Sequence, residues 1–148
     1  MKKLWMIAVV ACATLLVGCA SLESKAKNYA EDLFNAEMAN DEAAYDKIEV
    51  EIEEYIKTLP NDDEIDKFEE LLDKEYEALL QAHIAEIEKI AAKYANDFRN
   101  AINSGDEEKA SKALEEAEKH CMSLPDMDQA LFAEAFIRRA YTPAEGAE

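Results

Sequence analysis

The chain matches itself without a gap when residues 29–69 are laid over residues 94–134. The two segments are identical at 14 of 41 places, which include a Tyr-Ala-x-Asp start and a Leu-Pro stop. Similarity at a fixed period indicates a unit of supersecondary structure that is used twice. We therefore predict a 65-residue repeat, with two tandem units at about residues 22–86 and 87–141.

Each unit carries an apolar stripe with the spacing of an α-helix. In the first unit the stripe is Tyr45, Ile48, Ile52, Ile56 and Leu59. The aligned positions of the second unit hold Ala110, Ala113, Ala117, Cys121 and Leu124. Spacings of three and four place these side chains on one helix face, and no segment shows sustained β alternation. The pattern predicts an all-α fold with three antiparallel helices in each unit.

Cap and turn residues mark the predicted helix ends. The first helix of each unit should end at Asn40 or Gly105, which are residue types that tolerate a left-handed backbone. The second should end at a Leu-Pro pair, because proline disfavours helical geometry in the residue before it. The next helices should start at three capping pairs: Asn61 with Glu64, Ser104 with Glu107, and Asp126 with Gln129.

The middle of the chain contains neither glycine nor proline from residue 63 to residue 103. The third helix of the first unit can therefore continue into the first helix of the second, and we predict one long central helix that joins the units. A break near residues 81–83 is the competing interpretation. Residues 142–148 have no apolar face to bury, and we expect a disordered tail.

The chain of 148 residues has a formal net charge of −18. Residues 23–88 hold 22 acidic and 6 basic side chains, whereas residues 89–148 hold 12 and 8. Such a charge should repel nucleic acid, so we predict no nucleic-acid partner. A solvated helical surface is the default explanation for the acids, with loose binding of divalent cations as the alternative.

The N-terminus has the order of an export signal: Met1-Lys2-Lys3, then an apolar run to Leu15. The sequence Leu16-Val17-Gly18-Cys19 that follows resembles the lipobox of bacterial lipoproteins. The resemblance implies cleavage between Gly18 and Cys19 and lipid chains, such as palmitate, on Cys19. Residues 1–18 would then be a cleaved signal peptide and residues 19–21 a lipidated anchor before one helical domain at 22–141.

The resemblance also implies a location in the bacterial cell envelope, where the lipid is the contact with the membrane. Ala20 occupies the place where an aspartate often causes inner-membrane retention, which favours the outer membrane. One alternative is a transmembrane anchor at residues 4–17, which would span only about 21 Å of a core about 30 Å thick. The other alternative is an ordinary secretory signal with an accidental cysteine.

Residues 94–117 are similar to a tetratricopeptide repeat. Gly105-Asp106 falls at the inter-helix turn of that family, and Ala110, Leu114 and Ala117 fall at its small and apolar positions. Phe98 departs from the pattern, because the family prefers a small residue there. The resemblance implies helical-hairpin geometry and the binding of peptides or proteins.

Few residues point to catalysis or to a metal. Cys121 and His120 are adjacent on a predicted helix, so their side chains diverge by about 100°, and we interpret Cys121 as a core residue. His83 has no second histidine at helical spacing, which makes a zinc site a poor interpretation. The acidic segment at residues 61–64 lacks the glycine of a calcium loop and is interpreted as a helix start. We predict neither an enzyme nor a cofactor.

Three functions are open on the sequence. The first is a helical protein-binding or adaptor module of the cell envelope with an envelope protein as its partner. Aromatic anchors such as Tyr55, Tyr76 or Phe34 would serve it if they are exposed. The alternatives are a structural, acidic spacer lipoprotein, and a binder of a small molecule or divalent cation. The last would need a cavity between the units, lined by Tyr29, Tyr94 or His83.

Overall fold

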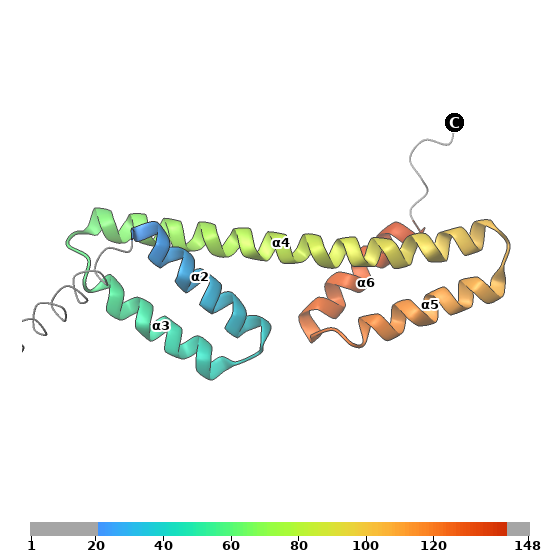
Figure 1. Ribbon diagram of the computed structural model, residues 1–148, viewed down its shortest axis with the longest axis horizontal. Helices are drawn as coiled ribbons and strands as arrows, with labels where there is room; N and C mark the ends of the chain where they lie inside the picture. The colour runs from blue at the N-terminus through green and yellow to red at the C-terminus, as the bar shows by residue number, and fades with distance from the viewer. Residues whose placement is uncertain (1–20, 142–148) are drawn as a thin grey trace, which may run out of the picture. The chain divides into compact units, whose positions relative to one another are not determined.

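The computed structural model describes residues 21–141, and the regular secondary structure in this range is entirely helical. Its helices are α2 (Leu22–Met38), α3 (Glu42–Ile56), α4 (Asp62–Asn103), α5 (Glu107–Cys121) and α6 (Asp126–Tyr141) (Figure 1). The predicted all-α class is confirmed.

Helix α4 is unbroken over 42 residues, from Asp62 to Asn103. It lacks glycine and proline throughout, and it is rich in alanine, leucine, glutamate and lysine, which have high helix propensity. The side chain of Asn61 caps its start, where Oδ1 accepts a hydrogen bond of 2.9 Å from the Glu64 amide. The predicted continuous helix is confirmed, and the competing break at residues 81–83 is wrong.

Two left-handed residues end α2 and α4 where the sequence predicts. Asn40 has φ of 52° and Gly105 has φ of 71°. This turn lets the amide of the following residue reach back into the helix. Asp41 N donates to the Ala36 carbonyl at 2.9 Å, and Asp106 N donates to the Ala101 carbonyl at 3.1 Å. The last carbonyls of both helices thereby gain partners.

Aspartates cap the two helices that follow these turns. Oδ1 of Asp41 accepts from the Ala44 amide, and Oδ1 of Asp106 accepts from the Lys109 amide, each at 3.0 Å. The predicted cap at Ser104 is wrong, because its hydroxyl donates backwards to the Ala101 carbonyl at 2.8 Å. Gly105 has a left-handed backbone and ends α4, so Asp106 is the first residue in a position to cap α5.

The start of α6 is likewise displaced by one residue from the prediction. Gln129 N donates to the Pro125 carbonyl at 3.0 Å, so Pro125 takes the cap position and Asp126 lies in the first turn. The Gln129 side chain still reaches back, donating to the Leu124 carbonyl at 2.9 Å.

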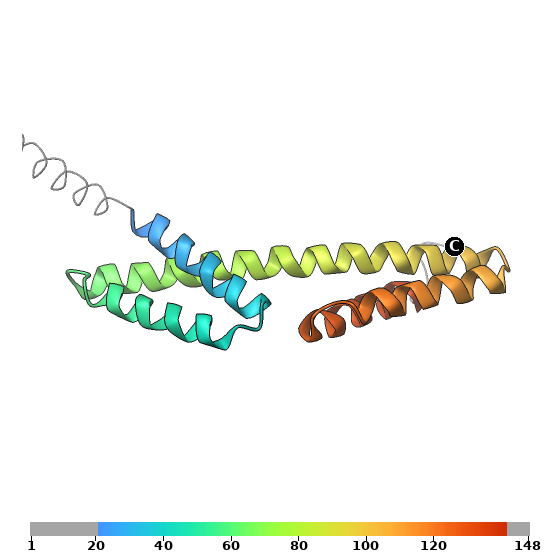
Figure 2. The same ribbon diagram turned by 60° about the horizontal axis from the view of Figure 1, so that its bottom comes forward.

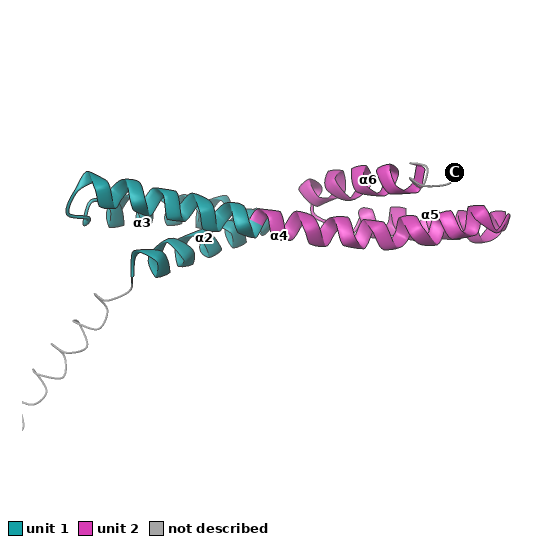
Figure 3. Ribbon diagram, turned by 90° about the horizontal axis from the view of Figure 1, so that it is seen from above, with its two compact units in different colours: residues 1–79 teal, residues 80–148 magenta. Residues whose placement is uncertain are grey.

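The chain divides into two compact units at Leu79 and Leu80, which is earlier than the predicted boundary at residues 86 and 87 (Figure 3). Unit 1 packs α2 and α3 with the first part of α4, and unit 2 packs the rest of α4 with α5 and α6. Consecutive helices within each unit run in opposite directions (Figure 2). The 65-residue repeat itself stays a prediction, although α3 and α5 have the same length of 15 residues.

The two cores differ in their side chains. The buried residues of the unit 1 cluster are Ala26, Leu33, Ile52 and Phe68. Those of the unit 2 cluster are Ile87, Ala91, Ala95, Phe98, Ala101, Ala110, Ala117, Phe132, Ala135 and Phe136. Many alanines let backbones approach closely, so unit 2 depends on a few phenylalanines for bulk.

Candidate functional site: an apolar groove between α5 and α6

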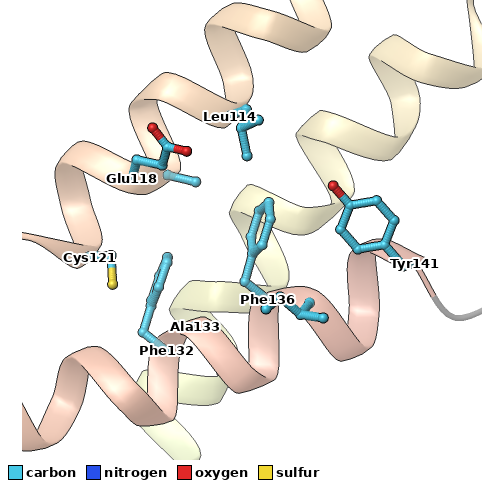
Figure 4. Close-up of a pocket in the computed structure, with 9 residues that line it drawn as sticks. Leu114, Glu118, Cys121, Phe132, Ala133, Phe136 and Tyr141 are labelled. Carbon is cyan, nitrogen blue, oxygen red and sulfur yellow. The ribbon is translucent and has the colours of Figure 1, made fainter.

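A groove of about 440 Å³ lies between α5 and α6 in unit 2 (Figure 4). Helix α5 lines it with Leu114, Ala117, Glu118 and Cys121. Helix α6 lines it with Phe132, Ala133, Phe136, Ile137 and Tyr141. The lining is apolar except for Glu118 and the Tyr141 hydroxyl. Its volume lies within the range of about 300–1,000 Å³ that is usual for ligand-binding clefts.

Small residues on α5 explain why the groove exists. Ala117 and Cys121 stand where the self-alignment places Ile52 and Ile56 of the first unit. The smaller side chains leave space between α5 and α6, and the aromatic rings of α6 fill only part of it. Phe132 and Phe136 are 2 % and 6 % exposed, and their rings stack with centroids 6.3 Å apart. The two rings therefore form a rigid apolar floor.

Large apolar side chains are exposed beside this floor. Ile137 is 57 % exposed and Tyr141 63 %, and both line the groove. Scattered exposed apolar residues need no explanation, but apolar residues that gather around a concave apolar surface mark interaction sites. No motif in the sequence marks this groove. The sequence feature that indicates it is the pair Ala117 and Cys121, which stand in the second stripe where the first has isoleucine.

Two polar side-chain contacts join α6 to α4, and neither involves a residue that lines the groove. His83 Nε2 lies 2.7 Å from Asp128 Oδ1, and Arg138 pairs with Glu88. Asp128 is 4 % exposed and is the one buried charged residue in the part of the chain that the structure describes. His83 thus bonds to a carboxylate instead of lining a cavity. Both contacts join α6 to α4 within unit 2.

His120 and Cys121 are not brought together as nucleophile and base. The His120 ring packs between Tyr94 and Phe132, with centroid distances of 5.1 and 5.3 Å. Its Nε2 is buried and has no hydrogen-bond partner within residues 21–141. Cys121 Sγ instead donates to the Gln129 carbonyl at 3.5 Å. As predicted, Cys121 packs against the core, where it also lines the groove.

The acidic segment at residues 61–64 is the capped start of α4, as the sequence predicts. Between residues 21 and 141 no group of three or more His, Cys, Asp or Glu side chains could hold a metal ion. No helix within the described range is both long enough and apolar enough to cross a membrane.

The aromatic residues that the sequence proposed as anchors pack within unit 1. Tyr55 lies 4.9 Å from Phe68 between ring centroids, and Tyr76 lies 6.3 Å from Phe34. All three candidates, Tyr55, Tyr76 and Phe34, are half-buried. Their surfaces serve the packing of α2, α3 and α4 rather than forming one open patch.

Two tyrosines of unit 1 have perturbed acidity. Burial raises the pKa of Tyr29 above its ordinary 10.0, and the charge of Glu51 adds to the effect. Burial also raises the pKa of Tyr45, with help from Glu49. Both phenols therefore stay protonated at physiological pH. Neither tyrosine lines the groove, and Tyr94 is likewise in the core of its own unit.

Some predicted residues lie outside the described range. Gly18 and Cys19 precede it, and the predicted tail at residues 142–148 follows it. The structure therefore tests neither the cleavage after Gly18, nor the lipid on Cys19, nor the disorder of the tail.

The sequence matches the family described as "Sporulation delaying protein family toxin" over residues 25–130. The match covers 106 of 148 residues and runs from α2 into α6. No curated protein and no solved structure matches the chain.

The match overturns the identification as a lipoprotein. The matched family is a toxin family, so the predicted lipoprotein class, with its lipobox and palmitate, is wrong. The membrane contact through a lipid and the outer-membrane location are wrong for the same reason. Four residues after an apolar run are a short motif, and an ordinary secretory signal can contain them by chance.

The match also overturns the predicted functions. It includes residues 94–117, so the tetratricopeptide resemblance is wrong, as are the adaptor role and the envelope protein partner. The two alternatives, an acidic spacer and a binder of a small molecule or divalent cation, do not fit a toxin family either. The resemblance arose from alanines on one helix face, which any closely packed helical hairpin needs.

Proposed function

We propose, because the chain belongs to the sporulation delaying protein family of toxins, that it is an exported toxin that binds a protein of its target cell. The family match over most of the chain carries this proposal. The toxin acts without catalysis in this proposal, and its target-binding surface is the groove between α5 and α6.

Export is supported by the first residues of the sequence. Two lysines followed by the apolar run from Leu4 to Leu15 have the composition of a secretory signal. The ordinary secretory signal, which was an alternative on the sequence alone, is the interpretation that suits a toxin that leaves the cell that makes it.

Binding to a protein is supported by charge and by the form of the groove. With a net charge of −18, the chain is repelled by anionic lipid headgroups, so attraction to a bare bacterial membrane is unfavourable. The groove is open and apolar, and Glu118 is the one charged residue that lines it. Such a surface suits the side chains of another protein better than it suits acid–base chemistry.

The toxin activity is tested by adding the purified chain to growing cultures of a spore-forming bacterium. We expect fewer viable cells, or a delay in the appearance of heat-resistant spores, in proportion to the amount added. Phe132→Asp, which places a charge at a buried position, should unfold unit 2 and abolish the effect. Unchanged growth and sporulation at every concentration would refute the proposal.

The export is tested by two substitutions of the same kind. Val9→Arg places a charge in the apolar run and should keep the chain inside the producing cell. Val50→Arg changes an exposed residue of α3 and should leave export intact. Immunoblots of cells and medium measure both, and equal export of the two variants would contradict the proposed signal.

A further inference from the structure

Acidic residues lie along both edges of the groove. On α5, Glu118 lines the groove, and Glu107 lies about three helical turns before it, on the same face. On α6, Asp126 lies about three turns before the lining residue Ile137 and shares its face in the same way. Glu134 is one turn before Ile137. All four acidic side chains are exposed.

The basic residues of these helices point elsewhere. Lys109, Lys112 and Lys119 lie about 100° or more around α5 from Glu118 at the ordinary helical rotation, and none lines the groove. On α6, Arg138 is paired with Glu88 of α4, Arg139 lies about 160° around the helix from Ile137, and neither lines the groove. The groove therefore presents an apolar floor between two acidic edges.

We propose that the groove binds a basic amphipathic helix of the toxin's target protein. The apolar face of that helix would contact Phe132, Phe136 and Ile137, while its lysines and arginines would lie beside the acidic edges. This is the general mode in which an amphipathic helix occupies a groove between two helices. The inference rests on the proposed function, because it names the kind of surface that the toxin recognises.

The dimensions fit such a partner. Helix α5 has 15 residues and is about 22 Å long, which accommodates about four turns of a bound helix. Helix α4 already covers the other side of the α5–α6 pair within unit 2. A fourth helix in the groove would complete a four-helix arrangement and would cover the exposed Ile137 and Tyr141.

Charge discriminates between this partner and others. An acidic helix or an anionic lipid headgroup would meet Glu107, Glu118, Asp126 and Glu134 as like charges. A second copy of this chain, which is itself strongly acidic, would be repelled for the same reason. The acidic edges thus select for a positive partner, and the floor selects for an apolar face.

The test measures binding of the purified full chain to three synthetic 18-residue peptides by isothermal titration calorimetry. One peptide is an amphipathic helix of leucine and lysine, the second has glutamate in place of lysine, and the third is the first in scrambled order. We expect binding of the leucine–lysine helix alone. Salt at about 1 M, where the Debye length is about 3 Å, should weaken it.

Variants locate the binding at the groove. Glu118→Lys should weaken binding about tenfold, because it replaces an attraction with a repulsion. The matched variant Glu116→Lys makes the same change on a face about 160° away and should alter affinity less than twofold. Ala133→Phe should abolish binding by filling the groove, and Ile137→Asp, at an exposed position, should do the same without unfolding the unit.

The results separate this inference from the proposed function. Equal binding of the scrambled or acidic peptide would overturn it, as would equal losses for Glu118→Lys and Glu116→Lys, or no binding at all. If the chain is toxic but does not bind the basic peptide, the proposed function stands and this inference is refuted. If the chain binds the basic peptide but has no effect on cells, the partner of the groove stands and the toxin function is refuted.

Discussion

Unit 1 and unit 2 use helices of similar arrangement but stabilise them differently. Residues 21–79 hold 20 acidic and 6 basic side chains, and residues 80–141 hold 12 and 8. In unit 1 the ion pairs Lys27–Glu31 and Lys47–Glu51 connect neighbouring turns of one helix. Unit 2 has one pair of the same kind, Lys89–Glu86, but its His83–Asp128 and Glu88–Arg138 contacts connect two helices.

The apolar packing differs in the same way. The Ile52 side chain and the rings of Tyr29, Tyr55 and Phe68 fill the space between the helices of unit 1. In unit 2 the matching stripe on α5 is mainly alanine, so the helices approach closely and rely on Phe132 for bulk. The comparison teaches that the unit with smaller stripe side chains is also the one with polar contacts between helices and with an open groove.

The largest expected effects come from removing the most deeply buried ring of each unit. Phe132→Ala and Phe68→Ala should each lower the free energy of unfolding by about 3–5 kcal/mol. Hydrogen exchange should show that each variant loses protection in its own unit first. Equal loss of protection in both units would show that they unfold together and would break the comparison.

The buried carboxyl group of unit 2 should have the next largest effect. Asp128→Asn should cost about 2 kcal/mol, because it changes the group that bonds to His83 at a buried position. Asp63→Asn, the same substitution at the aligned and exposed position of unit 1, should change stability by less than about 0.5 kcal/mol. Chemical denaturation measures both, and equal costs would contradict a special role for Asp128.

Substitution of His120 should have a smaller effect and should raise the stability. His120→Phe keeps an aromatic ring between Tyr94 and Phe132 and removes the buried, unpartnered Nε2. We expect a gain of about 1 kcal/mol in the free energy of unfolding, measured as a higher thermal midpoint. A loss of stability would mean that this nitrogen has a partner in solution, such as a bound water.

The smallest expected effect is a loss of stability of unit 1 at alkaline pH. The raised pKa values of Tyr29 and Tyr45 mean that the folded chain keeps these protons at a pH where the unfolded chain has lost them. The associated stability is complete below about pH 10 and is lost as the pH rises through the folded-state pKa values. Thermal midpoints from pH 8 to pH 11 measure the decline. Tyr29→Phe should make it shallower, and an unchanged slope would contradict the assignment.

Local chemistry made the fold largely predictable. The all-α class followed from apolar spacing, and the helix ends at Asn40 and Gly105 followed from backbone sterics that act within one or two residues. Two caps were displaced by one or two residues, to Asp106 and Pro125, because several neighbouring polar groups can satisfy the same amides. Continuity of α4 followed from the absence of glycine and proline.

The candidate site could not be derived in this way. Sequence shows that Ala117 and Cys121 are smaller than Ile52 and Ile56, but it does not show whether neighbouring helices close the gap. The tertiary structure decides this, because Phe132 and Phe136 stack into the floor and two polar contacts join α6 to α4. The family could not be derived from short motifs either, since Leu16-Val17-Gly18-Cys19 resembles the motif of another class.

The sequence by itself determined where helices begin and end, since helix propensity, capping and proline sterics act over a few residues. Only the tertiary structure decided which apolar residues are covered and which remain open. Asp63 and Asp128 illustrate the division, because the same residue type lies near a helix start in solvent in one unit and pairs with His83 in the interior of the other. Burial depends on contacts with residues that are distant in sequence, and the packing of the whole unit determines which residues those are.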